Sequence, residues 1–256
     1  MMIISNPVIL WALVGGVSGL TQGIAGTGGG AIAIPLLMIL GGYGIKDASG
    51  YGLLALTVSA AISWLIQRKN TLYPLTGVLI LFAGAVAFIS APLKVMSPPW
   101  VIIAFLNITF IFSLYSLWVL RKPDDPGEER PMSYRLKTAS IGGMITGFLS
   151  TMTGLGGGVV IIPWLTGITR LRFEQAMACS LLTIAVSAPF SAWRQDRFDL
   201  TLQEWIGLVF GVLIMAFLTQ KATSNVPRPK MLLIRKLTLT GVILISMART
   251  LFEALY

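Results

Sequence analysis

The sequence predicts an all-α membrane protein built from two repeats of inverted topology, each with about five apolar segments. Three observations support this fold class: 55% of the 256 residues are apolar, only 11% are charged, and a glycine motif occurs twice. Soluble domains carry roughly 25% charged residues. With a mean hydropathy of +0.81, the chain is expected to cross the membrane several times and to expose much of its surface to lipid.

The chain contains no histidine, and this removes several classes of chemistry. Neither His-ligated metal centres nor histidine acid–base catalysis can form, and the single cysteine, Cys179, cannot form an internal disulfide. No nucleophile–base pair or cluster of metal ligands is visible, so we expect neither an enzyme nor a bound cofactor. The nineteen Lys and Arg residues are scattered between apolar runs, which indicates basic cytoplasmic loops beside a lipid bilayer and not a nucleic-acid surface.

A polar stretch at residues 121–137, rich in proline and charge, divides ten apolar segments into two sets of five. A transmembrane helix needs about 20 apolar residues, and most of the segments approach that length. This division predicts one membrane domain with a first repeat at residues 1–120, a cytoplasmic linker at 121–137 and a second repeat at 138–256. In chain order the expected segments are Val8–Gly26, Gly28–Ile45, Ala48–Ile66, Leu72–Leu93, Trp100–Leu120, Thr138–Gly154, Gly156–Thr169, Ala176–Trp193, Leu202–Gln220 and Leu233–Tyr256.

The two sets of segments are related by a shift of 128 residues. Over residues 15–37, nine positions are identical to their counterparts, of which six are glycine and one is proline. An ungapped pattern of this kind indicates an internal repeat. The short segment 156–169 suits a partial or re-entrant helix, and its counterpart 28–45 begins with the same glycines. We therefore expect one broken or re-entrant helix in each half.

The positive charges indicate how the two repeats are oriented. If each half crosses the membrane an odd number of times, fourteen of the nineteen Lys and Arg residues lie on one side; an even number divides them ten to nine. Cytoplasmic loops carry the excess of positive charge, so the odd number is favoured. The halves are then inverted, and both termini are expected outside the cytoplasm.

Two glycine motifs mark the breaks between segments: Gly26-Thr27-Gly28-Gly29-Gly30 and Gly154-Leu155-Gly156-Gly157-Gly158. Glycine interrupts helices, and a broken helix is tolerated in a bilayer only where it is buried or lines a cavity. The helix that starts after such a break presents free N–H groups and the positive end of its dipole. Two such starts that meet near the midplane predict a site for a small anion. Close helix packing is the alternative, and it is favoured for Gly15, Gly19, Gly143 and Gly147.

Polar residues near the breaks are candidates for lining this site. Gln22 and Asn107 are the strongest, because a buried amide must satisfy several hydrogen bonds; both are expected either to line the cavity or to clamp helices. Arg249 lies deep in the last segment and could bind an anion or pair with Glu253 one turn further on. Thr153 precedes the second motif, although hydroxyl groups in spans often bond to their own helix.

Residues at the ends of the segments are expected at the membrane interface. They are Arg194, Asp196, Arg197 and Asp199 together with the tryptophans Trp11, Trp64, Trp100, Trp118, Trp193 and Trp205.

The doubled pattern G-x-G-G-G, four apolar residues and proline, at Gly26–Pro35 and Gly154–Pro163, resembles the TauE/SafE family of sulfite and organosulfonate exporters. The Ala-x-x-x-(Ser/Gly)-Leu-Leu elements at Ala48–Leu54 and Ala176–Leu182 are also similar to that family. The resemblance covers essentially the whole chain and implies secondary transport of small, mostly sulfur-containing anions across the bacterial inner membrane. Gln22 and its counterpart Ser150 replace the small or apolar residues that are more usual before the motif, which leaves the substrate open.

The expected function is export of a small anionic substrate, sulfite or an organosulfonate. No carboxylate lies in the middle of a segment to carry a proton, whereas an anion that leaves a negative-inside cell gains about 2.3 kcal/mol per charge per 100 mV. Export driven by the membrane potential is therefore the hypothesis. The alternatives are an uptake permease for another small organic anion and a non-transporting membrane partner protein, and homodimer formation is left open.

Overall fold

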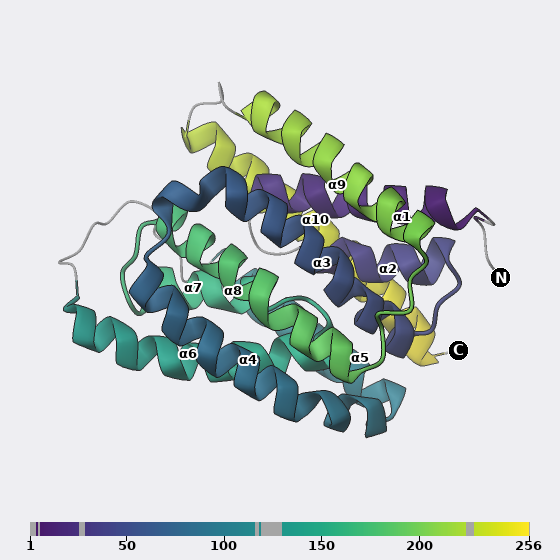
Figure 1. The fold of residues 1–256 in the computed structure, drawn as a ribbon, viewed down its shortest axis with the longest axis horizontal. Coiled ribbons are helices and arrows are strands. Elements are labelled where there is room, and N and C mark those ends of the chain that lie inside the picture. The colour runs from purple at the N-terminus through teal and green to yellow at the C-terminus, as the bar shows by residue number, and fades with distance from the viewer. Residues whose placement is uncertain are drawn as a thin grey trace.

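The computed structural model describes residues 4, 6–25, 29–115, 118, 130–223 and 228–255. These residues form ten α-helices and one short 3-10 helix and contain no β-strand, which confirms the all-α prediction (Figure 1). The helices are α1 (Pro7–Ala25), α2 (Gly30–Leu40), α3 (Ile45–Gln67), η1 (Arg68–Asn70), α4 (Tyr73–Met96), α5 (Pro99–Tyr115), α6 (Met132–Thr153), α7 (Gly158–Gly167), α8 (Phe173–Arg194), α9 (Leu202–Thr223) and α10 (Arg228–Leu255).

Each helix coincides with one of the ten apolar segments, and the differences lie at the ends. α2 and α7 have only 11 and 10 residues, which at a rise of about 1.5 Å per residue is roughly half of the 30 Å hydrocarbon core. They therefore have the length expected of partial helices. α6 begins at Met132 and not near Thr138, because Pro131 has an extended backbone at the N-cap and good helix formers follow it.

Five of the described helices are long and apolar enough to cross a membrane: α1, α3, α4, α8 and α9. Large apolar side chains cover their outer faces; Ile89 of α4 is 75% exposed and Phe217 of α9 is 67% exposed. A soluble monomer seldom exposes so much apolar surface, whereas in a bilayer these side chains contact lipid. The chain is a multi-pass membrane protein.

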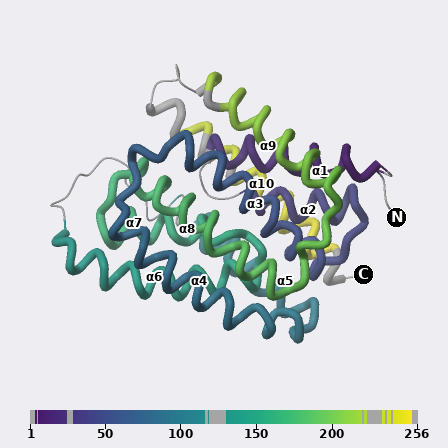
Figure 2. Tube along the Cα trace, in the orientation of Figure 1, coloured from purple at the N-terminus to yellow at the C-terminus, as the bar shows by residue number. Residues whose placement is uncertain are grey.

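α1 and α6 each pack along a helix of the other half of the chain. α1 lies beside α9 and α6 lies beside α4, as Figure 2 shows. Glycines bring the backbones together: a Cβ on Gly15 would lie 2.2 Å from the carbonyl oxygen of Leu208, and one on Gly147 would lie 2.3 Å from that of Ala83. Gly19 and Gly143 make the same kind of approach to α9 and α4. The packing interpretation of these four glycines is confirmed.

The helix contacts of the two halves correspond to each other under the shift of 128 residues. α1 is the counterpart of α6 and α9 is the counterpart of α4, so the α1–α9 and α6–α4 contacts are equivalent. Two further contacts, α3 with α8 and α5 with α10, join a helix to its own counterpart. The halves are therefore intertwined and do not form two separate bundles.

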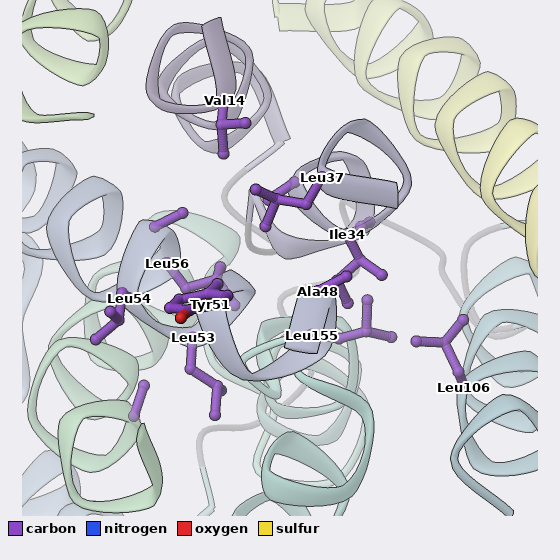
Figure 3. Packing of buried hydrophobic residues seen from close by; sticks show 14 of the residues in the cluster. Val14, Ile34, Leu37, Ala48, Tyr51, Leu53, Leu54, Leu56, Leu106 and Leu155 are labelled. Carbon is purple, nitrogen blue, oxygen red and sulfur yellow. The ribbon is translucent and has the colours of Figure 1, made fainter. Parts of the chain in front are cut away.

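The main apolar core lies around α3, whose residues Leu53, Leu54 and Leu56 are fully buried. Figure 3 shows Leu37 of α2 and Leu155, which follows α6, in the same cluster. Helices of both halves share this core, which therefore fixes the position of the two glycine motifs relative to each other.

Candidate functional site

The described parts of the two glycine motifs are in contact. A Cβ added to Gly30, the first residue of α2, would lie 2.8 Å from the carbonyl oxygen of Gly154 and 3.2 Å from Cα of Leu155. Gly154 and Leu155 belong to the break between α6 and α7, and all three residues are buried. A side chain at residue 30 would push the two motifs apart.

The break between α6 and α7 has a backbone conformation that favours glycine. Gly154, Gly156 and Gly157 have φ angles of +75°, +74° and +69°, in the left-handed region that side chains with a Cβ rarely adopt. Gly154 also lies directly against α3, because a Cβ there would be 2.2 Å from the carbonyl oxygen of Ser49. Both conformation and close packing therefore require glycine at residue 154.

Both short helices begin at buried glycines. α2 begins at Gly30 after the N-cap Gly29, and α7 begins at Gly158 after the N-cap Gly157. Neither N-cap residue has a side chain that could bond to the first N–H groups, which have no partner within the helix and carry the positive end of its dipole. Such a helix start can bind an anion.

A hydroxyl-bearing residue of a long helix contacts each N-cap glycine. A Cβ on Gly29 would lie 2.5 Å from Cβ of Ser18 in α1, and the Ser18 hydroxyl donates to the Gly29 carbonyl at 3.5 Å. A Cβ on Gly157 would lie 2.3 Å from Cγ2 of Thr146 in α6. Ser18 and Thr146 are counterparts in the repeat, so the two helix starts are supported in the same way.

Gln22 is fully buried, and neither its Nε2 nor its Oε1 has a hydrogen-bond partner among the residues that the structure describes. It lies one turn beyond Ser18 on α1, and residues four apart share a face of a helix. The amide therefore lies on the side of α1 that contacts the break at Gly29. A buried polar group without a partner costs about 1–3 kcal/mol, a cost that a bound ligand would offset.

Thr153 supports the second break. Its hydroxyl donates to the carbonyl oxygen of Leu149 at 2.6 Å and accepts a hydrogen bond from the N–H of Leu155 at 3.2 Å. Gly26, Thr27 and Gly28, which complete the first predicted motif, lie outside the described residues.

The polar contacts of Asn107 and Arg249 do not lead to the glycine breaks. Nδ2 of Asn107 in α5 donates to the hydroxyl of Thr250 in α10 at 3.3 Å, so it joins these two helices. Its Oδ1 is buried and finds no partner among the described residues. The Arg249 guanidinium lies 5.9 Å from the ring centroid of Phe252. The side chain of Glu253, the expected alternative partner of Arg249, lies outside the described residues.

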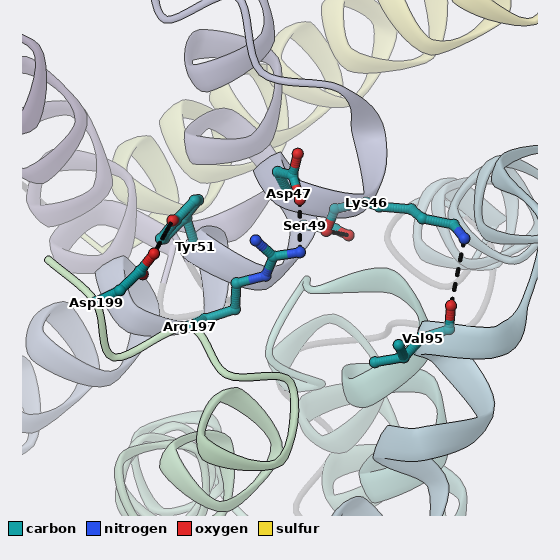
Figure 4. Close-up of polar contacts among 7 residues, drawn as sticks. All are labelled: Lys46, Asp47, Ser49, Tyr51, Val95, Arg197 and Asp199. Atoms are coloured by element: carbon teal, nitrogen blue, oxygen red, sulfur yellow. Dashed lines mark hydrogen bonds and ion pairs between the residues drawn. The ribbon is translucent and has the colours of Figure 1, made fainter.

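Sequence reasoning missed a polar cluster at the start of α3, shown in Figure 4. The Tyr51 hydroxyl donates to the carboxylate of Asp199, with oxygen–oxygen distances of 3.0 and 2.9 Å. Arg197 forms an ion pair of 2.5 Å with Asp47, and its guanidinium lies 5.3 Å from the centroid of the Tyr51 ring. Arg197 and Asp199 therefore contact α3 and are more than interfacial charges.

The end of α8 explains how the loop directs Arg197 toward α3. Asp196 has a left-handed φ of +52°, its N–H donates to the carbonyl of Trp193 at 3.1 Å, and the N–H of Arg197 donates to that of Ala192 at 3.1 Å. This pair of hydrogen bonds is the Schellman pattern that reverses the chain after a helix.

The interface prediction was wrong for Trp11, which is fully buried. Its Nε1 donates to Glu204 at 3.1 Å, and its ring packs edge-on against Tyr51 with centroids 5.7 Å apart. Trp11 therefore joins α1 to the start of α9 and to the polar cluster. Trp100 and Trp193, in contrast, are exposed by 68% and 61%, as expected of interface residues.

A helical membrane fold in which two buried, glycine-broken helix starts meet is typical of membrane transporters. The sequence profile described as "Sulfite exporter TauE/SafE" matches residues 11–249. The chain belongs to the TauE/SafE family.

Two relatives carry the name "probable membrane transporter protein". The one from Xylella fastidiosa (strain Temecula1) is 25% identical over 193 residues, which cover 73% of each chain. The one from Methanocaldococcus jannaschii is 24% identical over 190 residues, which cover 70% of this chain and 68% of the relative. No solved structure matches the chain.

Proposed function

We propose that this protein is a secondary transporter that exports a small anion, sulfite or an organosulfonate, across the inner membrane. The observation that carries the proposal is the contact between Gly30 and Gly154, which places the start of α2 against the break that precedes α7. An oxyanion there would accept hydrogen bonds from backbone N–H groups at the two helix starts. Gln22 would add the side-chain donor, because its amide is buried without a partner among the described residues, one turn from Ser18, which contacts Gly29.

The proposal includes an inverted repeat with both termini outside the cytoplasm. The equivalence of the α1–α9 and α6–α4 contacts supports a twofold relation between the halves. The excess of positive charge in one set of loops supports the orientation. In an inverted repeat two equivalent gates can open to opposite sides of one central site, which is the basis of alternating access.

Transport is tested with the purified chain in phospholipid vesicles loaded with radiolabelled sulfite, and in parallel with taurine and sulfoacetate. We expect saturable efflux of at least one of these anions. Gln22→Met is expected to reduce the efflux by about tenfold or more, because an apolar side chain cannot donate to the anion. Gln195→Met serves as the control, since the Gln195 amide already bonds to Ser191 at 2.8 Å. Vesicles that release none of these anions faster than protein-free vesicles would refute the function.

The membrane potential is the proposed driving force. An anion that leaves a negative-inside compartment gains about 2.3 kcal/mol per charge per 100 mV. Valinomycin with equal potassium on both sides removes the potential and is expected to stop concentrative efflux, whereas collapse of the pH gradient alone is expected to leave it intact. The reverse result would show coupling to protons.

A further inference from the structure

Lys94, near the end of α4, is a buried basic residue. Its side chain is only 2% exposed, and within the described part of the chain its Nζ has no hydrogen-bond partner. A buried ammonium group is strongly unfavourable unless an opposite charge lies close to it. The Asp47 carboxylate lies within electrostatic range, but it already forms the ion pair with Arg197. Lys94 therefore lacks an anion of its own.

Arg197 is a second cation within electrostatic range of Lys94. One edge of its guanidinium contacts Asp47, while its Nε is buried and has no hydrogen-bond partner in the described residues. A Cβ on Gly50 of α3 would lie 3.1 Å from this Nε, so the small residue leaves room for the guanidinium. Two donors of basic side chains, Nζ of Lys94 and Nε of Arg197, thus have no acceptor among the residues that the structure describes.

Lys46 connects the helices that carry these groups. Its Nζ donates to the carbonyl oxygen of Val95 at 3.3 Å, which joins the start of α3 to the end of α4 beside Lys94 (Figure 4). The start of α3, which carries Asp47 and Gly50, therefore lies beside the last turn of α4, which carries Lys94.

This cluster occurs at only one of the two equivalent ends of the repeat. The positions that correspond to Lys94, Asp47 and Tyr51 in the second half are Ala222, Gln175 and Cys179. The repeated helix arrangement forms with neutral residues at these counterparts, so it does not require the charges. The charged residues therefore belong to a function of this end of the molecule. The charge distribution of the loops predicts that this end lies on the non-cytoplasmic side.

We propose that Lys94 and Arg197 form a second oxyanion-binding subsite, separate from the glycine breaks, where α3 begins and α4 ends. A sulfite, sulfonate or carboxylate would accept hydrogen bonds from Nζ of Lys94 and Nε of Arg197. In an exporter, this subsite would be the last position that the anion occupies before release. That role rests on the export function proposed above, whereas the binding of an oxyanion does not depend on it. The phosphate of a lipid headgroup has the same chemistry, and the experiment separates the two sources.

The subsite is tested by equilibrium binding of sulfite to the full chain in maltoside detergent, with chloride, which is not an oxyanion, to hold the ionic strength constant. Gln22→Met is the starting variant, so that the central site does not contribute. We expect this variant to bind sulfite and the added change Lys94→Met to weaken the binding by about tenfold or more. Lys94→Arg is expected to retain most of the affinity because it keeps the charge.

Lys46→Met is the matched control, because it removes a neighbouring cation whose donor is already used. We expect its sulfite affinity in the Gln22→Met background to stay within about twofold. Equal affinities with and without Lys94 would overturn the proposal. A loss with Lys46→Met as large as the loss with Lys94→Met would also overturn it, since general charge would then explain the binding.

A second measurement tests whether the ligand is a lipid headgroup. The shift of the thermal midpoint is recorded for the same variants with sulfite and with soluble dihexanoyl phosphatidylglycerol. If sulfite raises the midpoint and Lys94→Met abolishes this increase, the subsite binds the solute. If only the lipid raises the midpoint in a way that Lys94→Met abolishes, the proposal is overturned. The proposed function is judged separately by efflux: if wild-type vesicles do not transport but Lys94-dependent binding persists, the function fails and the subsite stands.

Discussion

Gly42 and Arg170, which are counterparts in the two halves, have the same left-handed backbone conformation, with φ angles of +67° and +53°. Each follows a short helix, and in each case the next residue turns its N–H back to that helix. The N–H of Tyr43 donates to Leu37 at 3.2 Å, and that of Leu171 donates to Leu165 at 3.1 Å. The same turn is thus made once with glycine and once with an arginine, which adopts this conformation only with strain.

Arg170→Gly should therefore stabilise the protein. Arg170 is exposed, so little packing is lost, and relief of the left-handed strain exceeds the entropy cost of glycine by about 0.5–1 kcal/mol. The measurement is reversible unfolding in mixed micelles. Gly42→Arg is the matched control and should destabilise by a similar amount; an unchanged or lower stability of Arg170→Gly would contradict the strain.

Gly154→Ala should destabilise the protein by about 3 kcal/mol or more, since left-handed strain and overpacking against Ser49 act together. The new Cβ would lie 2.2 Å from a backbone oxygen, which cannot move aside as the end of a flexible side chain can. The comparison is Gly77→Ala in α4, where a Cβ would meet no atom within 4 Å. Gly77→Ala should be neutral or stabilising, and equal effects at the two positions would refute the close contact.

Gly211→Ala tests the contact between α1 and α9. A Cβ there would lie 2.1 Å from the carbonyl oxygen of Ala12, so the helices must separate, at a cost of about 2–3 kcal/mol. Gly241→Ala in α10, where nothing lies within 4 Å, is the control for helix propensity. Thermal midpoints in detergent give the difference, and a midpoint for Gly211→Ala at or above that of Gly241→Ala would exclude the contact.

Gln22→Met is expected to separate stability from transport. Replacing the unpaired buried amide by an apolar side chain of similar length should stabilise the ligand-free protein by about 1–3 kcal/mol while transport falls. Gln195→Met should instead lower the stability of the ligand-free protein, because it removes the hydrogen bond from Gln195 to Ser191. If Gln22→Met lowered both stability and transport, Gln22 would have a structural role and not the proposed one.

Tyr43, in the loop between α2 and α3, gives the polar cluster a dependence on pH. Burial raises the pKa of Tyr43, and the negative charges of Glu204, Asp199 and Asp47 raise it further. Because the folded pKa lies above the unfolded value of about 10, the related stability is fully present below that pH and is lost as the pH rises through the folded pKa. The stability difference between wild type and Tyr43→Phe should be constant from about pH 7 to 9 and shrink above 10. If the stability difference between wild type and Tyr43→Phe stayed constant up to the highest pH measured, the pKa of Tyr43 would not be raised by its surroundings.

The helices and the breaks were predictable from the sequence because they depend on local signals. The length of an apolar segment defines each span, and a run of glycines interrupts a helix whatever its position in the fold. The repeat also predicted that α2 and α7 are short, since Gly28–Gly30 and Gly156–Gly158 occupy the same positions in the two halves.

The partners of the helices were not predictable in the same way. The pairing of α1 with α9 depends on Gly207 and Gly211 meeting Val8 and Ala12 across most of the chain length. The spacing of Gly207 and Gly211 repeats that of Gly15 and Gly19, and in retrospect it is a signal for this pairing.

The polar cluster was missed because its members lie far apart in the sequence. Trp11, Tyr51 and Asp199 each resemble ordinary end-of-span residues when they are read alone. Only the turn at Asp196, which directs Arg197 toward Asp47, brings them together. A left-handed aspartate leaves no distinctive pattern in the sequence.

The pairing of α1 with α9 also determines how the protein can be assembled during synthesis. α1 precedes α9 in the chain, so the helix that covers its glycine face is translated only after the seven intervening α-helices, α2 to α8. An isolated N-terminal half would expose that face to lipid or to the quality-control proteases, whereas a chain cut within residues 121–129 and co-expressed as two pieces would restore both pairings. We therefore expect biogenesis to end with a late docking of the two halves and not with the completion of one after the other.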